Sequence, residues 1–280
     1  MKRTWIHHAI IVNEGRRFAG SVVIEGEKIQ EVIEGDGKPA ADCEEEIDAQ
    51  GCFLLPGVID DHVHFRDPGL THKADMATET AAAAAGGVTS FMDMPNCNPQ
   101  TTTLEALENK FKDAATKCIV NYSFYFGATN NNADQLKALD KTHVCGVKLF
   151  MGASTGNMLV DRMEALKKIF SEAGMLIATH CEDQQIIREN TERFKQQYGE
   201  DLDISFHPLI RSEEACYHSS ALAVQLAKET GARLHILHIS TARELGLLED
   251  RPLQEKKITA EACVSHLIFC DEDYAQLGAR

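Results

Sequence analysis

The segment FLLPGVIDDHVHFRDPG (residues 53–69) joins an apolar run to a His-x-His pair and a Pro-Gly turn. The run contains β-branched residues and predicts a buried strand over residues 55–62. Side chains two positions apart on a strand point to the same face of a sheet. We therefore expect His62 and His64 to project together from the carboxyl end of this strand, as a pair of metal ligands. Because His-x-His is short and also occurs at ordinary strand ends, the prediction depends on further ligands elsewhere.

The chain that follows alternates between two kinds of pattern. Further apolar segments predict strands over residues 87–93, 119–128, 144–151, 175–180, 233–239 and 258–263. Between them, helical patterns cover residues 74–85, 104–117, 133–139, 161–173, 183–198, 212–229 and 242–248. Alternating strands and helices over this length indicate an α/β fold with a parallel sheet. Polar residues at the strand ends, with no glycine-rich nucleotide loop, favour a (β/α)8 TIM barrel over a Rossmann fold.

The N-terminal residues have a different pattern. Residues 1–54 contain short strand candidates at 5–12, 21–25, 28–33 and 44–48, separated by turns. We interpret them as part of a small β-sandwich-like domain, and residues 55–280 as the barrel. Only seven barrel strands are found before residue 280. Since an open barrel would leave an unpaired edge, we expect the chain to be a fragment that stops before the eighth strand.

Composition excludes several classes of function. The 280 residues have a formal net charge of −15, which argues against nucleic acid or an anionic membrane as the main partner. The nine cysteines form no C-x-x-C pair, so we expect reduced thiols and neither a disulfide framework nor a cysteine-type zinc module. No signal-peptide core or run of transmembrane length is seen. These features are typical of a soluble cytoplasmic protein with a small-molecule substrate.

Lys148 is the most unusual residue of the predicted strands, because it lies within the apolar segment GVKLFM (residues 146–151). A buried, unpaired ammonium group is costly, and burial lowers the pKa of lysine towards a neutral amine. A neutral amine reacts with CO2 to form a carbamate, whose two oxygens are able to bridge two metal ions. The alternatives are a lysine paired with a carboxylate and one that extends to the surface.

Two more histidines lie at predicted strand ends. His180 ends the strand at 175–180, while His235 and His238 both lie in the strand at 233–239. Because His235 and His238 are three apart, the alternation of a strand predicts that only one faces the barrel interior. We assign His238 as the ligand, since barrel sites lie at the carboxyl end, and His235 to the core or an interface. Imidazole and carboxylate-type ligands suit Zn²⁺, with Mn²⁺, Co²⁺ or Fe²⁺ as alternatives.

Two residues are candidates for substrate binding. Arg66 follows the histidine pair at the next alternate position, where its guanidinium offers a bidentate site for a carboxylate. Asn96 follows the second strand, and its amide is suited to orient the same group. The alternatives are an ion pair of Arg66 with Asp61 or Asp67, and a turn-capping role for Asn96. Glu261 and His266 are interpreted first as structural or supporting residues.

These motifs together resemble a known family. PGVIDDHVHFRDPG (56–69) closely resembles the opening signature of dihydroorotases in the amidohydrolase superfamily. DMPN (93–96), VKLFM (147–151) and the segments at 207–208, 211–213 and 238–240 are also similar to that family. The resemblance implies a cyclic amidohydrolase of the carboxylated-lysine type. It implies two metal ions bound by five residues, and a substrate carboxylate held by Arg66 and Asn96; the five are His62, His64, Lys148, His180 and His238.

The activity implied by the resemblance is reversible interconversion of (S)-dihydroorotate and N-carbamoyl-L-aspartate in pyrimidine biosynthesis, through a metal-bridged hydroxide. Hydantoinases, dihydropyrimidinases and allantoinases have a similar pattern, and Arg66 favours dihydroorotate because that ring carries a carboxylate. A non-catalytic dihydroorotase-like subunit is a further alternative. The family's catalytic Asp ends strand eight, so we expect no catalytic residue of that kind before residue 280. We also expect a homodimer or a higher homo-oligomer.

Overall fold

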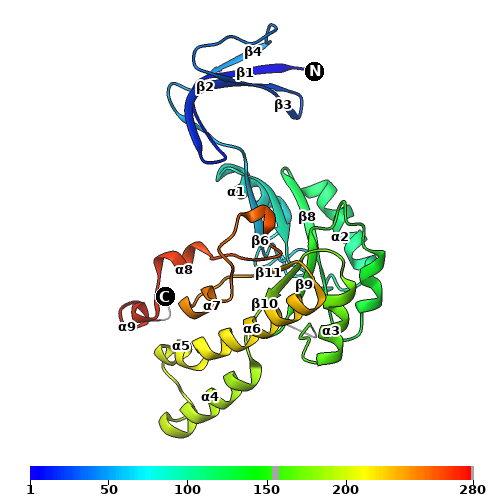
Figure 1. Ribbon diagram of the computed structural model, residues 1–280, viewed down its shortest axis with the longest axis vertical. Coiled ribbons are helices and arrows are strands. Elements are labelled where there is room, and N and C mark those ends of the chain that lie inside the picture. The colour runs from blue at the N-terminus through cyan, green and yellow to red at the C-terminus, as the bar shows by residue number, and fades with distance from the viewer. Residues whose placement is uncertain (153–157, 279–280) are drawn as a thin grey trace. The chain divides into compact units, whose positions relative to one another are not determined.

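The computed structural model describes residues 1–152 and 158–278 of the chain (Figure 1). The chain divides into two compact units, Met1–Val58 and Ile59–Arg280. The segment that carries His62 and His64 belongs to the second unit. No helix in the described ranges is both long enough and apolar enough to cross a membrane.

The N-terminal unit is built on one five-stranded sheet. Its strands follow the order β3-β2-β1-β4, and β5 also pairs with β1. The β1–β2 and β2–β3 pairs are antiparallel, whereas β4 and β5 run parallel to β1. The strands are β1 (Arg3–Asn13), β2 (Arg16–Glu25), β3 (Lys28–Glu34), β4 (Glu45–Asp48) and β5 (Phe53–Leu54). The apolar face of this sheet is small, with a buried cluster of Ala9, Ile11 and Val22.

The second unit contains all seven predicted barrel strands. They form one sheet in chain order, and every pair from β7 to β12 is parallel (Figure 1). The strands are β6 (Val58–Val63), β7 (Val88–Asp93), β8 (Asn121–Gly127), β9 (Gly146–Phe150), β10 (Ile177–His180), β11 (Leu234–Ile236) and β12 (Ile258–Ala260). The sheet curls so that its first and last strands approach each other: His62 on β6 and Glu261 just after β12 are hydrogen-bonded. This arrangement confirms the predicted barrel-type α/β fold.

Helices connect these strands close to the predicted positions. Predicted caps are also found, for example Ser212, whose hydroxyl accepts a hydrogen bond from the Ala215 amide at the start of α6. Residues 133–138 are a 3-10 helix, η1, and not an α-helix, because the Asn132 side chain bonds to Thr102 and Gly127 and leaves the helix start uncapped. The α-helices are α1 (Met76–Ala85), α2 (Leu104–Lys117), α3 (Met163–Glu172), α4 (Gln184–Tyr198), α5 (His207–Ile210), α6 (Glu213–Thr230), α7 (Ala242–Leu245), α8 (Val264–Ile268) and α9 (Tyr274–Leu277). The other short 3-10 helices are η2 (Ile204–Phe206), η3 (Leu253–Glu255) and η4 (Asp271–Asp273).

The core lies between the sheet and its helices, and β9 is its most enclosed strand. All five residues of β9 are buried. Val147 and Leu149 join the main apolar cluster, together with Phe124 and Phe126 of β8. A strand buried on both faces has no route to solvent for a polar side chain, so the environment of Lys148 follows from the position of β9 in the sheet.

A buried ion pair fixes the end of β7 against α2. Lys110 Nζ lies 2.5 Å from Asp93 Oδ2, and both side chains are 1% exposed. Lys110 also donates a hydrogen bond to the Met94 carbonyl, and Asp93 accepts one from the Phe65 amide. The pair thereby joins the segment after β6 to the segment after β7, which carry Arg66 and Asn96.

Replacing Lys110 with methionine is expected to lower the free energy of unfolding by about 3–5 kcal/mol, because it leaves the Asp93 carboxylate buried without its partner. Urea denaturation followed by circular dichroism measures the change. Lys112→Met is the matched control on the same helix, since Lys112 forms an exposed pair with Glu108. It should change the free energy by no more than about 0.5 kcal/mol. Equal effects of the two substitutions would contradict a structural role for the buried pair.

Candidate metal centre

Four of the predicted histidine ligands gather at the carboxyl ends of β6, β10 and β11. The ring centroids of His62 and His64 are 5.3 Å apart, and those of His62 and His238 are 5.6 Å apart. His180 and His238 are closer, with centroids at 4.8 Å. Residues separated by up to 176 positions in the chain are therefore brought together by the parallel sheet.

His180 and His238 direct two ring nitrogens at each other. His180 Nδ1 lies 2.8 Å from His238 Nε2. The other nitrogen of His180, Nε2, is 2.8 Å from Glu182 Oε2. Arg211 in turn binds Glu182 through both carboxylate oxygens. A carboxylate bonded to the outer nitrogen of a histidine fixes the ring orientation and leaves the inner nitrogen as a metal ligand.

Lys148 lies deep in the sheet and is 1% exposed. It is paired in register with Ala178 of β10, so its side chain shares a face with His180 two positions later. Among the described residues its Nζ makes no hydrogen bond or ion pair, and it lies 4.5 Å from the centroid of the Phe150 ring. The lysine is thus not paired with a carboxylate and does not extend to the surface.

The electrostatics favour neutral nitrogen ligands. Burial lowers the pKa of Lys148 to about 7. Burial, reinforced by the neighbouring charges of Arg66 and His62, lowers the pKa of His64 to about 3. The same cause, with His180 and Lys148 nearby, lowers the pKa of His238 to about 3. These groups are therefore unprotonated, or readily become so, near neutral pH, as metal ligation requires.

The donor set fits divalent metal ions. His64 Nδ1 is buried and has no hydrogen-bond partner. Such a buried, unpaired acceptor is costly unless another ligand satisfies it. Together with the facing nitrogens of His180 and His238 and with Lys148, it forms a set of imidazole and lysine groups that fits divalent metal ions.

Glu261, interpreted from the sequence as a structural or supporting residue, forms a carboxylate–histidine group whose members the sequence did not predict. Glu261 accepts a hydrogen bond from His62 Nδ1 and another from the His238 amide. Glu261 Oε2 also lies 3.2 Å from His235 Nε2, with Asp61 Oδ2 3.8 Å from the same nitrogen. Burial opposes ionisation of Glu261, but the hydrogen bonds from His235 and His62 outweigh it and lower the pKa of the carboxyl group. Glu261 therefore orients His62, as Glu182 orients His180.

The prediction that only one of His235 and His238 faces inward is wrong. His235 is in register with Ala178 and hence with Lys148, so it lies on the inner face. β11 ends at Ile236, and His238 has φ = 41°, outside strand geometry. Alternation does not extend to His238, whose ring reaches His180 by this turn of the backbone.

Arg66 and Asn96 also come together, although not by alternation. Arg66 lies beyond the end of β6 with φ = 61°, and its Nη1 donates a hydrogen bond to the Asn96 carbonyl at 3.3 Å. Neither expected ion pair of Arg66 is found in the described part of the chain, since Asp67 pairs with Lys117. Asn96 is 8% exposed, and its side-chain oxygen has no hydrogen-bond partner that caps a turn among the described residues.

A close approach of two loops holds this pair. Gly69 has φ = +84°, and a Cβ there would lie 1.8 Å from the Asn98 carbonyl oxygen. Only glycine permits the segment after β6 to pack this tightly on the segment after β7. As a result, the Arg66 guanidinium, which has no carboxylate partner among the described residues, and the Asn96 side chain both lie beside His64.

A cavity of about 880 Å³ opens next to the His180–His238 side of the site. Its lining includes Glu182 and Arg211, together with residues of α8 and α9. The cavity is large enough for a small cyclic molecule. Its lining does not include Arg66 or Asn96.

Comparison with known proteins places the chain in a family. Residues 51–244 match the family model described as Dihydro-orotase-like, and the chain belongs to this family of the amidohydrolase superfamily. It is 34% identical over 243 residues to a dihydroorotase from Methanosarcina mazei, covering 83% of this chain and 52% of that protein. It is 32% identical over 281 aligned positions to an allantoinase from Deinococcus radiodurans, covering 96% of this chain and 60% of that protein.

The fold is similar to that of a solved hydantoinase. The L-hydantoinase (dihydropyrimidinase) from Arthrobacter aurescens matches with a TM-score of 0.90 and 25% identity, over 99% of this chain and 62% of that one. The chain thus spans 52–62% of the length of these relatives. The comparisons confirm the superfamily and the fold, and the named relatives are cyclic amide hydrolases.

Glu182→Gln is expected to weaken divalent-metal binding at this centre by about 10–100-fold, because it removes the carboxylate that orients His180. Titration of the metal-free protein with Zn²⁺ against a chelator of known affinity measures the loss. Glu214→Gln is the matched control, since Glu214 also pairs with an arginine, Arg243, but on the surface. Unchanged affinity in Glu182→Gln would show that His180 needs no carboxylate support.

Proposed function

We propose that the protein is a metal-dependent cyclic amide hydrolase that interconverts (S)-dihydroorotate and N-carbamoyl-L-aspartate. The observation that carries this proposal is the Arg66 guanidinium, which has no carboxylate partner within the described residues and lies beside the histidine cluster. A guanidinium in this position is suited to bind the carboxylate of dihydroorotate through two hydrogen bonds. Asn96, whose buried side-chain oxygen is unpaired, is placed to orient the amide edge of the ring.

The proposed metal ligands are His62, His64, Lys148, His180 and His238. The Lys148 amine, kept partly neutral by burial, would add to CO2 and lose a proton to give a carbamate, whose two oxygens would serve as metal ligands. Two divalent ions, with Zn²⁺ the first choice for this ligand set, would supply a nucleophilic water at neutral pH and Lewis-acid polarisation of the scissile carbonyl.

Other residues of this chain would position the substrate and orient the metal ligands. Arg66 and Asn96 would hold the ring so that its amide carbonyl faces the histidine cluster, which lowers the entropic part of the barrier. Glu182 and Glu261 would keep His180 and His62 in their ligating orientations. Ring opening adds water across the C–N bond, so the carbonyl carbon gains an oxygen and the ring nitrogen gains a proton.

Allantoinase is the second candidate. It is favoured by the allantoinase relatives, one of which aligns with 96% of this chain, against 83% for the dihydroorotase from Methanosarcina mazei. Allantoin has no carboxylate, so this function leaves Arg66 without a charged partner.

A substrate panel separates the candidates. The full-length protein, loaded with Zn²⁺, is assayed with dihydroorotate, allantoin, hydantoin and dihydrouracil, and the cyclisation of N-carbamoyl-L-aspartate is measured in parallel. We expect turnover of dihydroorotate in both directions, at least about 100-fold more efficient than that of the uncharged rings. A preference for allantoin would overturn the first proposal. Metal binding with no turnover of any ring would indicate a non-catalytic relative.

A further inference from the structure

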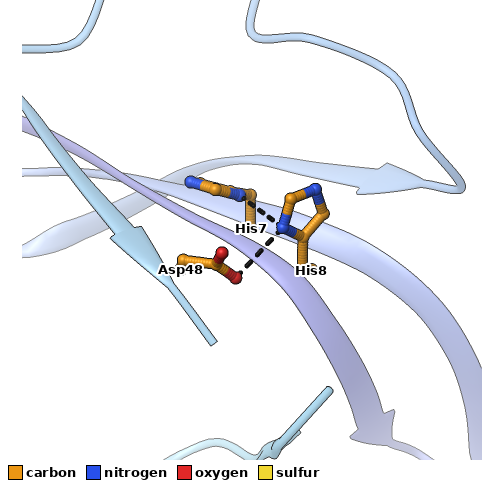
Figure 2. A group of neighbouring side chains, drawn as sticks. All are labelled: His7, His8 and Asp48. Atoms are coloured by element: carbon orange, nitrogen blue, oxygen red, sulfur yellow. Dashed lines mark hydrogen bonds and ion pairs between the residues drawn. The ribbon is translucent and has the colours of Figure 1, made fainter. Parts of the chain in front are cut away.

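Three potential metal ligands meet in the N-terminal unit, on residues that take no part in the chemistry described above. Figure 2 shows the rings of His7 and His8 on β1 beside the carboxylate of Asp48 at the end of β4. His7 Nδ1 and His8 Nδ1 are 3.1 Å apart, and His8 Nδ1 is 3.0 Å from Asp48 Oδ1. All three ligand atoms lie within 4.8 Å of one another.

A bulge in β1 creates this arrangement. Ile6 pairs with Val22 and Ala9 pairs with Gly20, so His7 and His8 together oppose a single residue of β2. Consecutive side chains on a regular strand point to opposite faces, and a bulge changes this direction locally. His7 is in register with Asp48 on the parallel strand β4, and the left-handed backbone of His8 (φ = 51°) brings the second ring to the same carboxylate.

The surroundings hold His7 more firmly than His8. The His7 ring packs on Trp5, with centroids 4.4 Å apart, and its side chain is 14% exposed. Glu46 Oε2 lies 4.0 Å from His7 Nε2, so a carboxylate is near the ring nitrogen that does not face His8 Nδ1. The side chain of His8 is 66% exposed and that of Asp48 47%, so one side of the group is open to solvent.

The spacing matches one tetrahedral ion. Ligand atoms 2.0–2.1 Å from Zn²⁺ are separated by about 3.3 Å along an edge of the tetrahedron. The 3.0 Å and 3.1 Å separations need only a small outward movement to admit the ion. Two imidazole nitrogens and one carboxylate oxygen are typical zinc ligands, and three protein ligands leave a fourth position for water.

We propose that His7, His8 and Asp48 form a mononuclear divalent-metal site, with Zn²⁺ as the preferred physiological ion. The ion binds His7 Nδ1, His8 Nδ1 and Asp48 Oδ1, with solvent in the fourth position. The site ties β1 to β4 and is independent of the histidines at the carboxyl ends of the barrel strands. Its loss therefore leaves the chemistry of that centre unchanged.

Equilibrium dialysis of the purified protein against Zn²⁺, followed by metal analysis, tests the proposal. Wild type should bind one more equivalent than His8→Gly, a substitution that removes the ring and suits the left-handed backbone. His143→Ala is the matched control, because His143 is exposed and lies 2.7 Å from a carboxylate oxygen of Asp140 but has no second histidine in the group. The control should bind as many ions as wild type.

A second measurement reports on the ligand atoms directly. In long-range ¹H–¹⁵N spectra of the wild-type protein, Zn²⁺ should shift the Nδ1 signals of His7 and His8, whereas the His143 signals should not move. Equal zinc stoichiometry in wild type and His8→Gly, an equal loss in His143→Ala, or unshifted His7 and His8 signals would overturn the proposal.

Discussion

Lys148→Ala is expected to lower kcat/KM for dihydroorotate by more than about 100-fold, beyond the range that loss of a supporting partner costs. The reason is that Lys148 is buried and unpaired among the described residues, and its proposed carbamate would supply two anionic oxygens as metal ligands. The metal content of the variant should fall in parallel. Steady-state kinetics and metal analysis on the same preparation measure both effects.

The cavity left by this substitution provides a specific control. A small carboxylate such as propionate fits the space of the lost side chain and should restore part of both the activity and the metal content. Lys168→Ala, which removes a partly exposed lysine paired with Asp134, should have no effect on either. Full activity and full metal content in Lys148→Ala would refute the bridging role.

Arg66→Met is expected to lower kcat/KM for dihydroorotate by about 100-fold or more, and to leave turnover of an uncharged ring within about twofold. Two hydrogen bonds from a guanidinium to a carboxylate contribute about 3 kcal/mol or more, which corresponds to about 100-fold in kcat/KM. Competition between dihydroorotate and hydantoin in one assay measures the change in preference.

Arg66→Lys is the matched variant for the Arg66 prediction. It keeps the positive charge but loses the planar fork, so its preference should lie between those of wild type and Arg66→Met. If Arg66→Met lowered turnover of charged and uncharged rings equally, Arg66 would shape the loop after β6 and not recognise a carboxylate.

The fold was predictable from the sequence because its strands are apolar runs bounded by turns and helical patterns. The predicted strand at residues 144–151 contains β9, which is buried throughout. The clustering of the histidines at strand ends was also predictable, since parallel strands bring their carboxyl ends to one edge. The helical pattern at 133–139 predicted an α-helix, but residues 133–138 fold as a 3-10 helix. The Asn132 side chain bonds to Gly127 and does not cap the helix start.

Glu261 was predicted to be a structural or supporting residue, but the contacts of the supporting residues could not be predicted. The His62–Glu261 contact joins residues 199 positions apart, and the Glu182–Arg211 pair joins residues 29 positions apart. No spacing rule covers such contacts, which depend on the curl of the sheet and on the path of a loop. Alternation also fails beyond the last residue of a strand, as Arg66 and His238 show with their left-handed backbones.

Anomalous diffraction at the zinc edge, from crystals grown with Zn²⁺ and bicarbonate, tests the central claim most directly. We expect two peaks at the carboxyl ends of the barrel strands, one contacted by His62 and His64 and the other by His180 and His238. Density for a carbamate on Lys148 should lie between the two peaks. Absence of anomalous density at these histidines, or two ions with unmodified Lys148 directed away from both, would contradict the account.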